Sequence, residues 1–183
     1  MISKHKYWLG LTIILAGCNS SEVSADGLII ENLKTGLVCP LPLWNNIEPE
    51  KYKTNICHET STIMITGQGI CTYKNEQRPC TWYGFEFDYK NAKPNHKLSC
   101  ISKTEYTADF GNPEKIVAED VNQINFELKL DDKNGHFFNP QYTVFNRVSK
   151  ANSIETHEIS CFDGSSEVFK IKERLIYPVK LDE

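Results

Sequence analysis

Long apolar segments and an excess of basic residues are both missing from this 183-residue chain. No run of residues reaches the ~20 apolar positions that a membrane-spanning helix requires. Lys and Arg number 20 against 24 Asp and Glu, which gives a formal net charge of −4. A nucleic-acid-binding protein needs a basic stripe that neutralises phosphates. The composition therefore excludes nucleic acid as a partner.

Sequence motifs for the common enzyme chemistries are also missing. The chain has no GxSxG, HExxH, phosphate-loop or GxGxxG pattern. His157-Glu158 begins like HExxH, but Cys161 stands where the second histidine would be. The segment 132–135 matches part of a calcium loop and lacks its first and last acidic ligands. The sequence predicts no catalytic residue, no metal site and no cofactor, so we expect a protein that is not an enzyme.

What the chain does contain is seven cysteines, an odd number, and the N-terminus accounts for the first of them. Lys4 and Lys6 precede an apolar run from Tyr7 to Leu15, and small residues follow up to Cys18. A cationic start, a short apolar segment and small residues before a cleavage site are typical of a secretory signal. The run is about half the length of a membrane span, so we do not expect a transmembrane helix here.

The residues Leu15-Ala16-Gly17-Cys18 resemble the lipobox of bacterial lipoproteins. The resemblance implies a signal peptide over 1–17, lipid on the Cys18 sulfur, and acylation of the new N-terminus with a fatty acid such as palmitate. Asn19 stands where an aspartate usually retains such proteins in the inner membrane. The pattern thus implies the outer membrane, facing the periplasm. An ordinary secreted protein with a chance cysteine is the alternative.

Residues 18–27 are small and polar and predict a flexible tether, followed by a single domain over 28–183. Six cysteines remain in this domain, and an exported chain meets an oxidising compartment, so we expect three disulfides. The sequence allows 15 pairings. We favour a local bridge between Cys71 and Cys80. Cys39 and Cys57 lie in the same irregular N-terminal region and could close a second loop, which leaves Cys100 with Cys161. A zinc site is the alternative, but the spacing lacks paired CxxC knuckles.

Alternating apolar and polar residues predict β-strands through most of the domain. The clearest alternation covers 81–89, with four aromatics on one face, and 124–130. Further strands are expected near the following segments: 62–66, 98–104, 137–147, 153–162 and 167–177. About seven short strands and at most short helices predict a mainly β fold, an antiparallel sandwich or barrel stapled by disulfides.

The sequence also predicts the local structure of three further segments. Residues 28–60 contain several prolines and predict an irregular segment with a short helix near 49–56. Asn112-Pro113-Glu114 has the pattern of a helix start, with the helix ending near Asp120. Asp131 to Gly135 predicts a β-hairpin turn, because Asn-Gly accepts positive φ.

Aromatic residues outside the main alternation are the candidates for a binding surface. Trp82 lies on the opposite face from the alternating set, and a second group follows the 131–135 turn: His136, Phe137, Phe138 and Tyr142. Aromatic rings anchor interfaces and stack on sugars, although a core role is the alternative for both groups.

The function predicted from these features is that of a non-enzymatic, membrane-anchored lipoprotein that binds a protein or an envelope component. It would act as an inhibitor, an immunity factor or an assembly accessory. A glycan- or small-ligand-binding module is the alternative, and an envelope hydrolase is a third possibility that no motif supports.

Overall fold

The computed structural model describes residues 27–38, 55–67, 69–111, 115–144 and 153–177. Strands make up about four fifths of these residues, and no helix occurs among them. A helix able to cross a membrane is accordingly not found in this part of the chain. The strands are β1 (Ile29–Val38), β2 (Ile56–Glu59), β3 (Thr62–Met64), β4 (Gly69–Tyr73), β5 (Glu76–Lys90), β6 (His96–Gly111), β7 (Ile116–Leu130), β8 (Gly135–Val144), β9 (Ile154–Asp163) and β10 (Ser166–Ile176).

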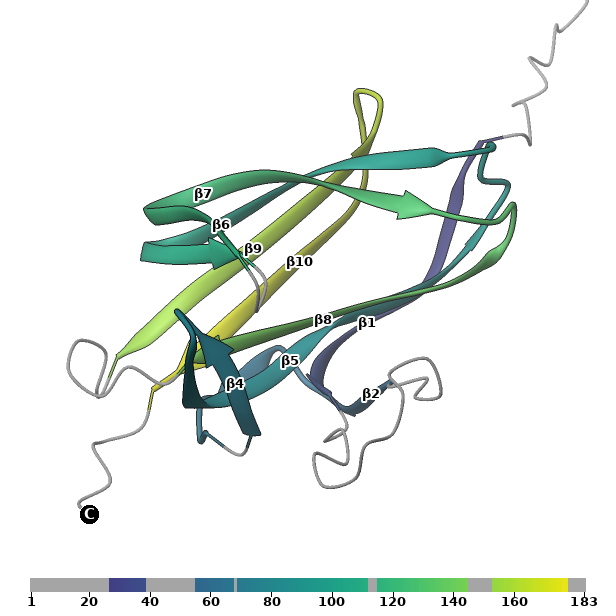
Figure 1. Cartoon of the computed structure of the whole chain (residues 1–183). Coiled ribbons are helices and arrows are strands. Elements are labelled where there is room, and N and C mark those ends of the chain that lie inside the picture. Colours follow the sequence, from purple (N-terminus) through teal and green to yellow (C-terminus); the bar gives the residue numbers. More distant parts are fainter. Residues whose placement is uncertain (1–26, 39–54, 68, 112–114, 145–152, 178–183) are drawn as a thin grey trace, which may run out of the picture.

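The strands form two five-stranded sheets that face each other (Figure 1). In the first, here sheet A, β5 is the central strand. β8 pairs with most of its length, β1 with its second half and β4 with its beginning, and β2 pairs with β1. The second, sheet B, has the order β3-β10-β9-β6-β7. Every pairing is antiparallel except the short parallel contact of β3 with β10. The prediction of a mainly β, antiparallel sandwich or barrel is confirmed, and the fold is the sandwich.

The core lies between the two sheets. From sheet A, β5 directs four aromatics inward at every second position, as its alternation predicted: Tyr83, Phe85, Phe87 and Tyr89. Three of these rings pack against residues of sheet B: Leu98, Leu128, Leu130, Ile159 and Ile171. Tyr83 belongs to a second, smaller cluster with Ile63, Ile65, Leu175 and Tyr177. Burial of these side chains stabilises the sandwich by roughly 1.5–3 kcal/mol for each one.

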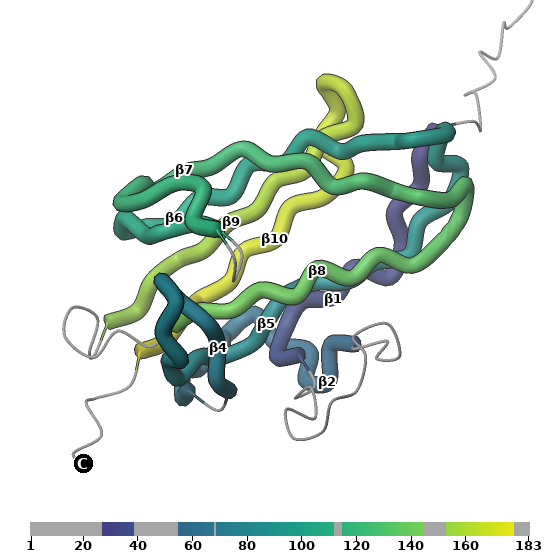
Figure 2. The backbone as a smooth tube through the Cα atoms, viewed as in Figure 1, coloured from purple at the N-terminus to yellow at the C-terminus, as the bar shows by residue number. Residues whose placement is uncertain are grey.

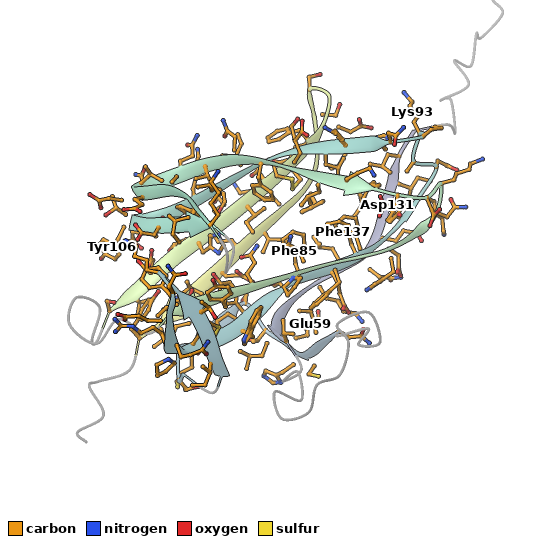
Figure 3. All side chains as sticks on the ribbon, viewed as in Figure 1. Glu59, Phe85, Lys93, Tyr106, Asp131 and Phe137 are labelled. Carbon is orange, nitrogen blue, oxygen red and sulfur yellow. A yellow bond between two sulfur atoms is a disulfide. The ribbon has the colours of Figure 1, made fainter. Side chains whose placement is uncertain are left out.

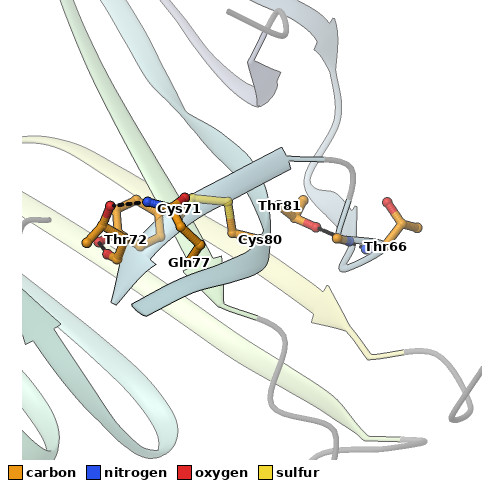
Figure 4. Close-up of a disulfide and its surroundings, with 8 residues drawn as sticks. Thr66, Cys71, Thr72, Gln77, Cys80 and Thr81 are labelled. Carbon is orange, nitrogen blue, oxygen red and sulfur yellow. Dashed lines mark hydrogen bonds between the residues drawn. A yellow bond between two sulfur atoms is a disulfide. The ribbon is translucent and has the colours of Figure 1, made fainter. Parts of the chain in front are cut away.

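Two disulfides connect neighbouring strands within the sheets. Cys71 and Cys80 join β4 to β5, with Cα atoms 5.8 Å apart (Figure 4). Cys100 and Cys161 lie directly opposite each other on β6 and β9, with a Cα separation of 4.1 Å. Both predicted pairings are confirmed. Cys57 is also disulfide-bonded, but its partner lies outside the described residues, so its pairing with Cys39 stays a prediction.

Two of the local predictions were wrong where the structure describes them. Residues 29–38 and 56–59 form strands instead of an irregular segment, because β1 pairs along β5 and β2 then pairs with β1. Most of the helix predicted over 49–56 lies outside the described residues. Residues 116–120 belong to β7 and not to a helix, since the pairing with β6 continues as far as Gly111 opposite Ile116.

The turn predicted at 131–135 exists but does not form a hairpin. It joins β7 of sheet B to β8 of sheet A, so the two strands that it connects pair with different neighbours. Neither Asn134 nor Gly135 has a positive φ. Gly135 is required for another reason: a Cβ there would lie 2.7 Å from the hydroxyl of Tyr89. The Asn134 side chain accepts a hydrogen bond from the Asn91 backbone N–H at 3.1 Å.

Candidate binding surface

β8 and β5 together place one row of apolar side chains on the outer face of sheet A. Successive residues of a strand point to opposite faces, so Phe138, Pro140 and Tyr142 share the outward face of β8. The register sets Tyr142 opposite Trp82 of β5 and Pro140 opposite Gly84. We call Trp82, Phe138, Pro140 and Tyr142 the outer strip.

Trp82 and Tyr142 form the aromatic end of the outer strip. Their ring centroids are 5.0 Å apart with the planes tilted by 53°. Gly69 lies against the indole, and a Cβ at this glycine would be 3.0 Å from Cδ1 of Trp82. The Tyr142 hydroxyl donates to the Thr72 carbonyl at 3.3 Å, and partial burial raises the pKa of Tyr142. Both rings are half-buried, so each is positioned and still presents a solvent-facing part.

The other end of the outer strip is charged. Glu86 is 5% exposed and accepts a hydrogen bond from the Ile56 backbone N–H at 3.0 Å. Lys34 Nζ lies 3.7 Å from the Glu86 carboxylate. His136 Nδ1 lies 2.9 Å from Asp88 Oδ1, and its Nε2 is 3.7 Å from Glu86. We call Lys34, Glu86, Asp88 and His136 the charged cluster.

Asp88 is the most strongly bonded carboxylate of the charged cluster. The Asn32 side-chain amide donates to it at 2.7 Å. This hydrogen bond, and then the one from His136, hold the pKa of Asp88 below its ordinary value. The apolar row therefore ends at the Asp88 carboxylate and its hydrogen-bonding neighbours, an arrangement suited to a partner with both apolar and polar groups.

Four of the five predicted surface residues meet on this face, and one does not. Trp82, Phe138 and Tyr142 lie in the outer strip and His136 lies beside it. Phe137 points inward because it is the sequence neighbour of two outward residues. Its ring stacks on Phe87 with centroids 5.1 Å apart, and Figure 3 shows it directed between the sheets. Phe137 is a core residue, and its assignment to the surface was wrong.

A buried polar cluster inside the sandwich was missed by the sequence analysis. Ser102 Oγ lies 2.8 Å from His157 Nε2, and His157 Nδ1 lies 3.3 Å from Glu173 Oε2. The Thr35 hydroxyl of sheet A donates a hydrogen bond to the Glu173 carboxylate. These residues come from β6, β9, β10 and β1, so no local sequence pattern could have indicated their meeting.

The order serine, histidine, carboxylate resembles that of a hydrolytic triad. Such a triad requires a serine that a substrate can reach, whereas Ser102 and His157 are each 4% exposed and Glu173 is 2% exposed. The arrangement acts instead as a polar link between the two sheets. Burial, followed by the nearby Glu173 carboxylate, raises the pKa of Tyr83, whose ring meets His157 edge-on at 6.1 Å.

The remaining histidine and cysteine candidates do not converge on a metal. His96 Nε2 lies 3.1 Å from Asp163 Oδ1, and His96 Nδ1 accepts a hydrogen bond from the Lys93 backbone N–H. Within the described ranges, no group of three or more potential ligands is placed to hold a metal ion. A shallow hollow of about 440 Å³ lies on the outer face of sheet B, lined by Ile101, Glu127, Phe162 and neighbouring residues. Cys18 lies outside the described residues.

Comparison with known proteins adds one structural likeness. No protein-family model matches the chain, and no curated protein matches it. The crystal structure of an immunoglobulin-like protein from Pseudomonas aeruginosa is similar to it, with 13% sequence identity and a TM-score of 0.43. The match covers 82% of this chain and 98% of the other.

Proposed function

We propose that this protein is a lipid-anchored β-sandwich domain of the bacterial envelope that works by binding a protein or envelope component. The lipobox-like residues 15–18 support the anchor on Cys18 and, with Asn19, a place in the outer membrane facing the periplasm. The two disulfides support an oxidising compartment. The protein is proposed to be non-enzymatic, of the inhibitor, immunity or assembly-accessory kind.

The outer strip is the observation that carries the proposal. Grouped apolar side chains on the outer face of a sheet mark an interaction site, and interfaces are typically built from an aromatic centre with a polar rim. Trp82 and Tyr142 are held by Gly69 and by the Thr72 carbonyl before any partner arrives. A partner would thus bind without paying the entropy of ordering these rings.

The binding role is tested by capture from solubilised envelope with the full chain and two matched variants. Phe138→Ala removes a half-buried ring from the outer strip, whereas Phe162→Ala removes a half-buried ring from the outer face of sheet B. We expect Phe138→Ala to lose at least about tenfold in partner recovery, which corresponds to ~1.4 kcal/mol. Equal recovery by both variants, or no reproducible partner, would contradict the proposal.

Glycan binding is the second candidate, and the Trp82–Tyr142 pair favours it, because tilted aromatic rings can take the apolar face of a sugar. Isolated peptidoglycan and polysaccharide are the probes. Binding that is lost in Trp82→Ala and retained in Phe162→Ala would assign the surface to glycan. An envelope hydrolase remains the least supported function.

The anchor is tested separately from the binding surface. Cys18→Ala is expected to leave the protein without lipid and to move it from the membrane fraction to the soluble fraction. Mass measurement of the processed N-terminus checks the modification. A Cys18→Ala variant that is still processed and membrane-bound would refute the anchor and leave the binding surface open to its own test.

A further inference from the structure

The edge of sheet B offers a long strand with an unpaired side. Among the described residues, β7 pairs only with β6. Residues 121–130 make no backbone hydrogen bond to any strand other than β6. An edge strand presents a row of free N–H and C=O groups that can pair with another chain. Figure 2 shows β7 and β8 leaving their common turn and separating toward the other end of the molecule.

The sandwich is incompletely covered along this side. Near the turn, the inward side chains of β7 are buried, with Leu128 3% exposed and Leu130 fully buried. Farther along β7, Ile124 and Phe126 are only half-buried. A strand added to β7 would continue sheet B and cover these two apolar side chains.

The other free edges are short or blocked. β2, β3 and β4 have only four, three and five residues. β8 carries Pro140 in its middle, which lacks an N–H and protects an edge strand from pairing. The part of β7 from Gln123 to Leu130 has neither proline nor bulge in its register with β6. β7 is therefore the edge best suited to pairing.

We propose that β7 pairs with β7 of a second copy of this chain, antiparallel and about a two-fold axis at Phe126. This register overlaps residues 122–130 of both copies. It sets Phe126 opposite its own equivalent and Ile124 opposite Leu128, so that each half-buried apolar side chain meets an apolar one. On the outer face Gln123 meets Lys129, and Asn125 meets Glu127.

Charge and polarity favour this register over its neighbours. An axis at Glu127 would set two glutamates directly opposite each other, which destabilises an antiparallel pair. An axis at Asn125 would set the inward Leu128 opposite the polar Asn122. With the axis at Phe126, no two like charges lie directly opposite, and each Glu127 keeps its Lys97 neighbour at 2.6 Å. The inference rests on β7 alone and does not depend on the proposed function.

Sedimentation of the full chain, produced with its disulfides formed, measures the association. We expect a concentration-dependent dimer. Ile124→Lys places a charge on the inward face of the edge strand and should weaken the dimer by at least about 30-fold. Gln123→Lys adds the same charge one residue away, on the solvent face, and should change the dissociation constant of the dimer little. Thermal unfolding of both monomers shows whether either substitution damages the fold.

Cross-linking tests the register. Cysteines at 126 would face each other within disulfide reach, whereas cysteines at 124 would lie four residues from their equivalents, about 13 Å apart. We expect Phe126→Cys to yield a dimer that reduction dissolves, and Ile124→Cys to yield none. A chain that stays monomeric at all concentrations overturns the proposal. A dimer that survives Ile124→Lys overturns it equally.

Discussion

The interior of the sandwich has two ends that are held together by different forces. At one end, Phe85, Phe87 and Phe169 form a cluster of stacked and tilted rings with centroids 5.1–6.4 Å apart. At the other, His157 and Glu173 form a polar link with hydrogen-bonding neighbours. The first end depends on apolar burial, which has no preferred direction. The second combines a few directional polar contacts, each of which is costly to break, with a smaller apolar cluster that contains Tyr83, Leu175 and Tyr177.

The polar end is reinforced at its rim by a second link between the sheets. Tyr73, at the tip of the β4–β5 hairpin, donates a hydrogen bond of 2.5 Å to Asp109 of β6. Lys74 Nζ lies 3.1 Å from the same carboxylate. One end of the sandwich is therefore stabilised mainly by apolar burial, whereas the other is stabilised also by directional contacts between the two sheets.

The largest loss of stability is expected from Phe87→Ala, which removes a fully buried ring from the centre of the aromatic cluster. A cavity of this kind costs about 3–5 kcal/mol of unfolding free energy. Urea unfolding of the oxidised protein measures it. A loss below about 1 kcal/mol would show that the apolar end closes around the gap and that its ring packing contributes little.

The next largest loss is expected from Glu173→Ala, because it removes the partner of both His157 and Thr35 in a buried site. Leaving such groups unpaired costs about 2–4 kcal/mol. Glu173→Gln keeps the shape and is the matched control, which should lose less. A double-mutant cycle with Thr35→Val measures the coupling, and additive losses would argue against a network.

A smaller effect, dependent on pH, is expected at the rim. The hydrogen bond from Tyr73 holds the pKa of Asp109 below its ordinary value of 3.8. The folded carboxylate releases its proton more readily than the unfolded one, so its stabilisation is present above this value and is lost as the pH falls through the lower folded pKa. Asp109→Asn should cost about 1 kcal/mol at neutral pH and flatten the acid limb of the stability curve. An unchanged acid limb would contradict this assignment.

The smallest effect is expected from Lys170→Ala on the outer face of sheet B. Lys170 Nζ lies 2.8 Å from Glu158, but its side chain is 47% exposed. Surface pairs of this kind contribute at most about 1 kcal/mol, and salt screens them. Lys170→Ala therefore serves as the reference for the three substitutions above. A loss of unfolding free energy as large as that of Asp109→Asn would show that the link at Asp109 contributes no more than an exposed surface pair.

Much of the fold could be predicted from local patterns. The alternation at 81–89 and 124–130 identified β5 and part of β7 with their inward faces. β1 was not predicted, because its polar and apolar residues alternate irregularly and its conformation follows from pairing with β5. The helix at 112–120 was predicted from a capping pattern, which a long β6–β7 pairing overrides at residues 116–120.

The candidate surface was predicted in part. The aromatic residues that follow the 131–135 turn indicated His136, Phe138 and Tyr142. Trp82 was indicated because it falls on the opposite face from the alternating aromatics. Only the β5–β8 register shows that these residues lie side by side on one face. The same register directs Phe137 inward, where its ring packs against Phe87. The Ser102–His157–Glu173 cluster could not be predicted, since Ser102 lies 55 residues before His157 and only the sheet pairing brings them together.

The strand-rich class, the inward faces of the clearest strands and the local Cys71–Cys80 bridge could all be predicted from the sequence, because each follows from residue alternation or from cysteine spacing. The tertiary structure alone decided that β7 and β8 enter different sheets and that a polar cluster closes one end of the core. Those features depend on contacts between distant strands, and the free energy of such contacts is set by sheet pairing and burial, which no local pattern encodes.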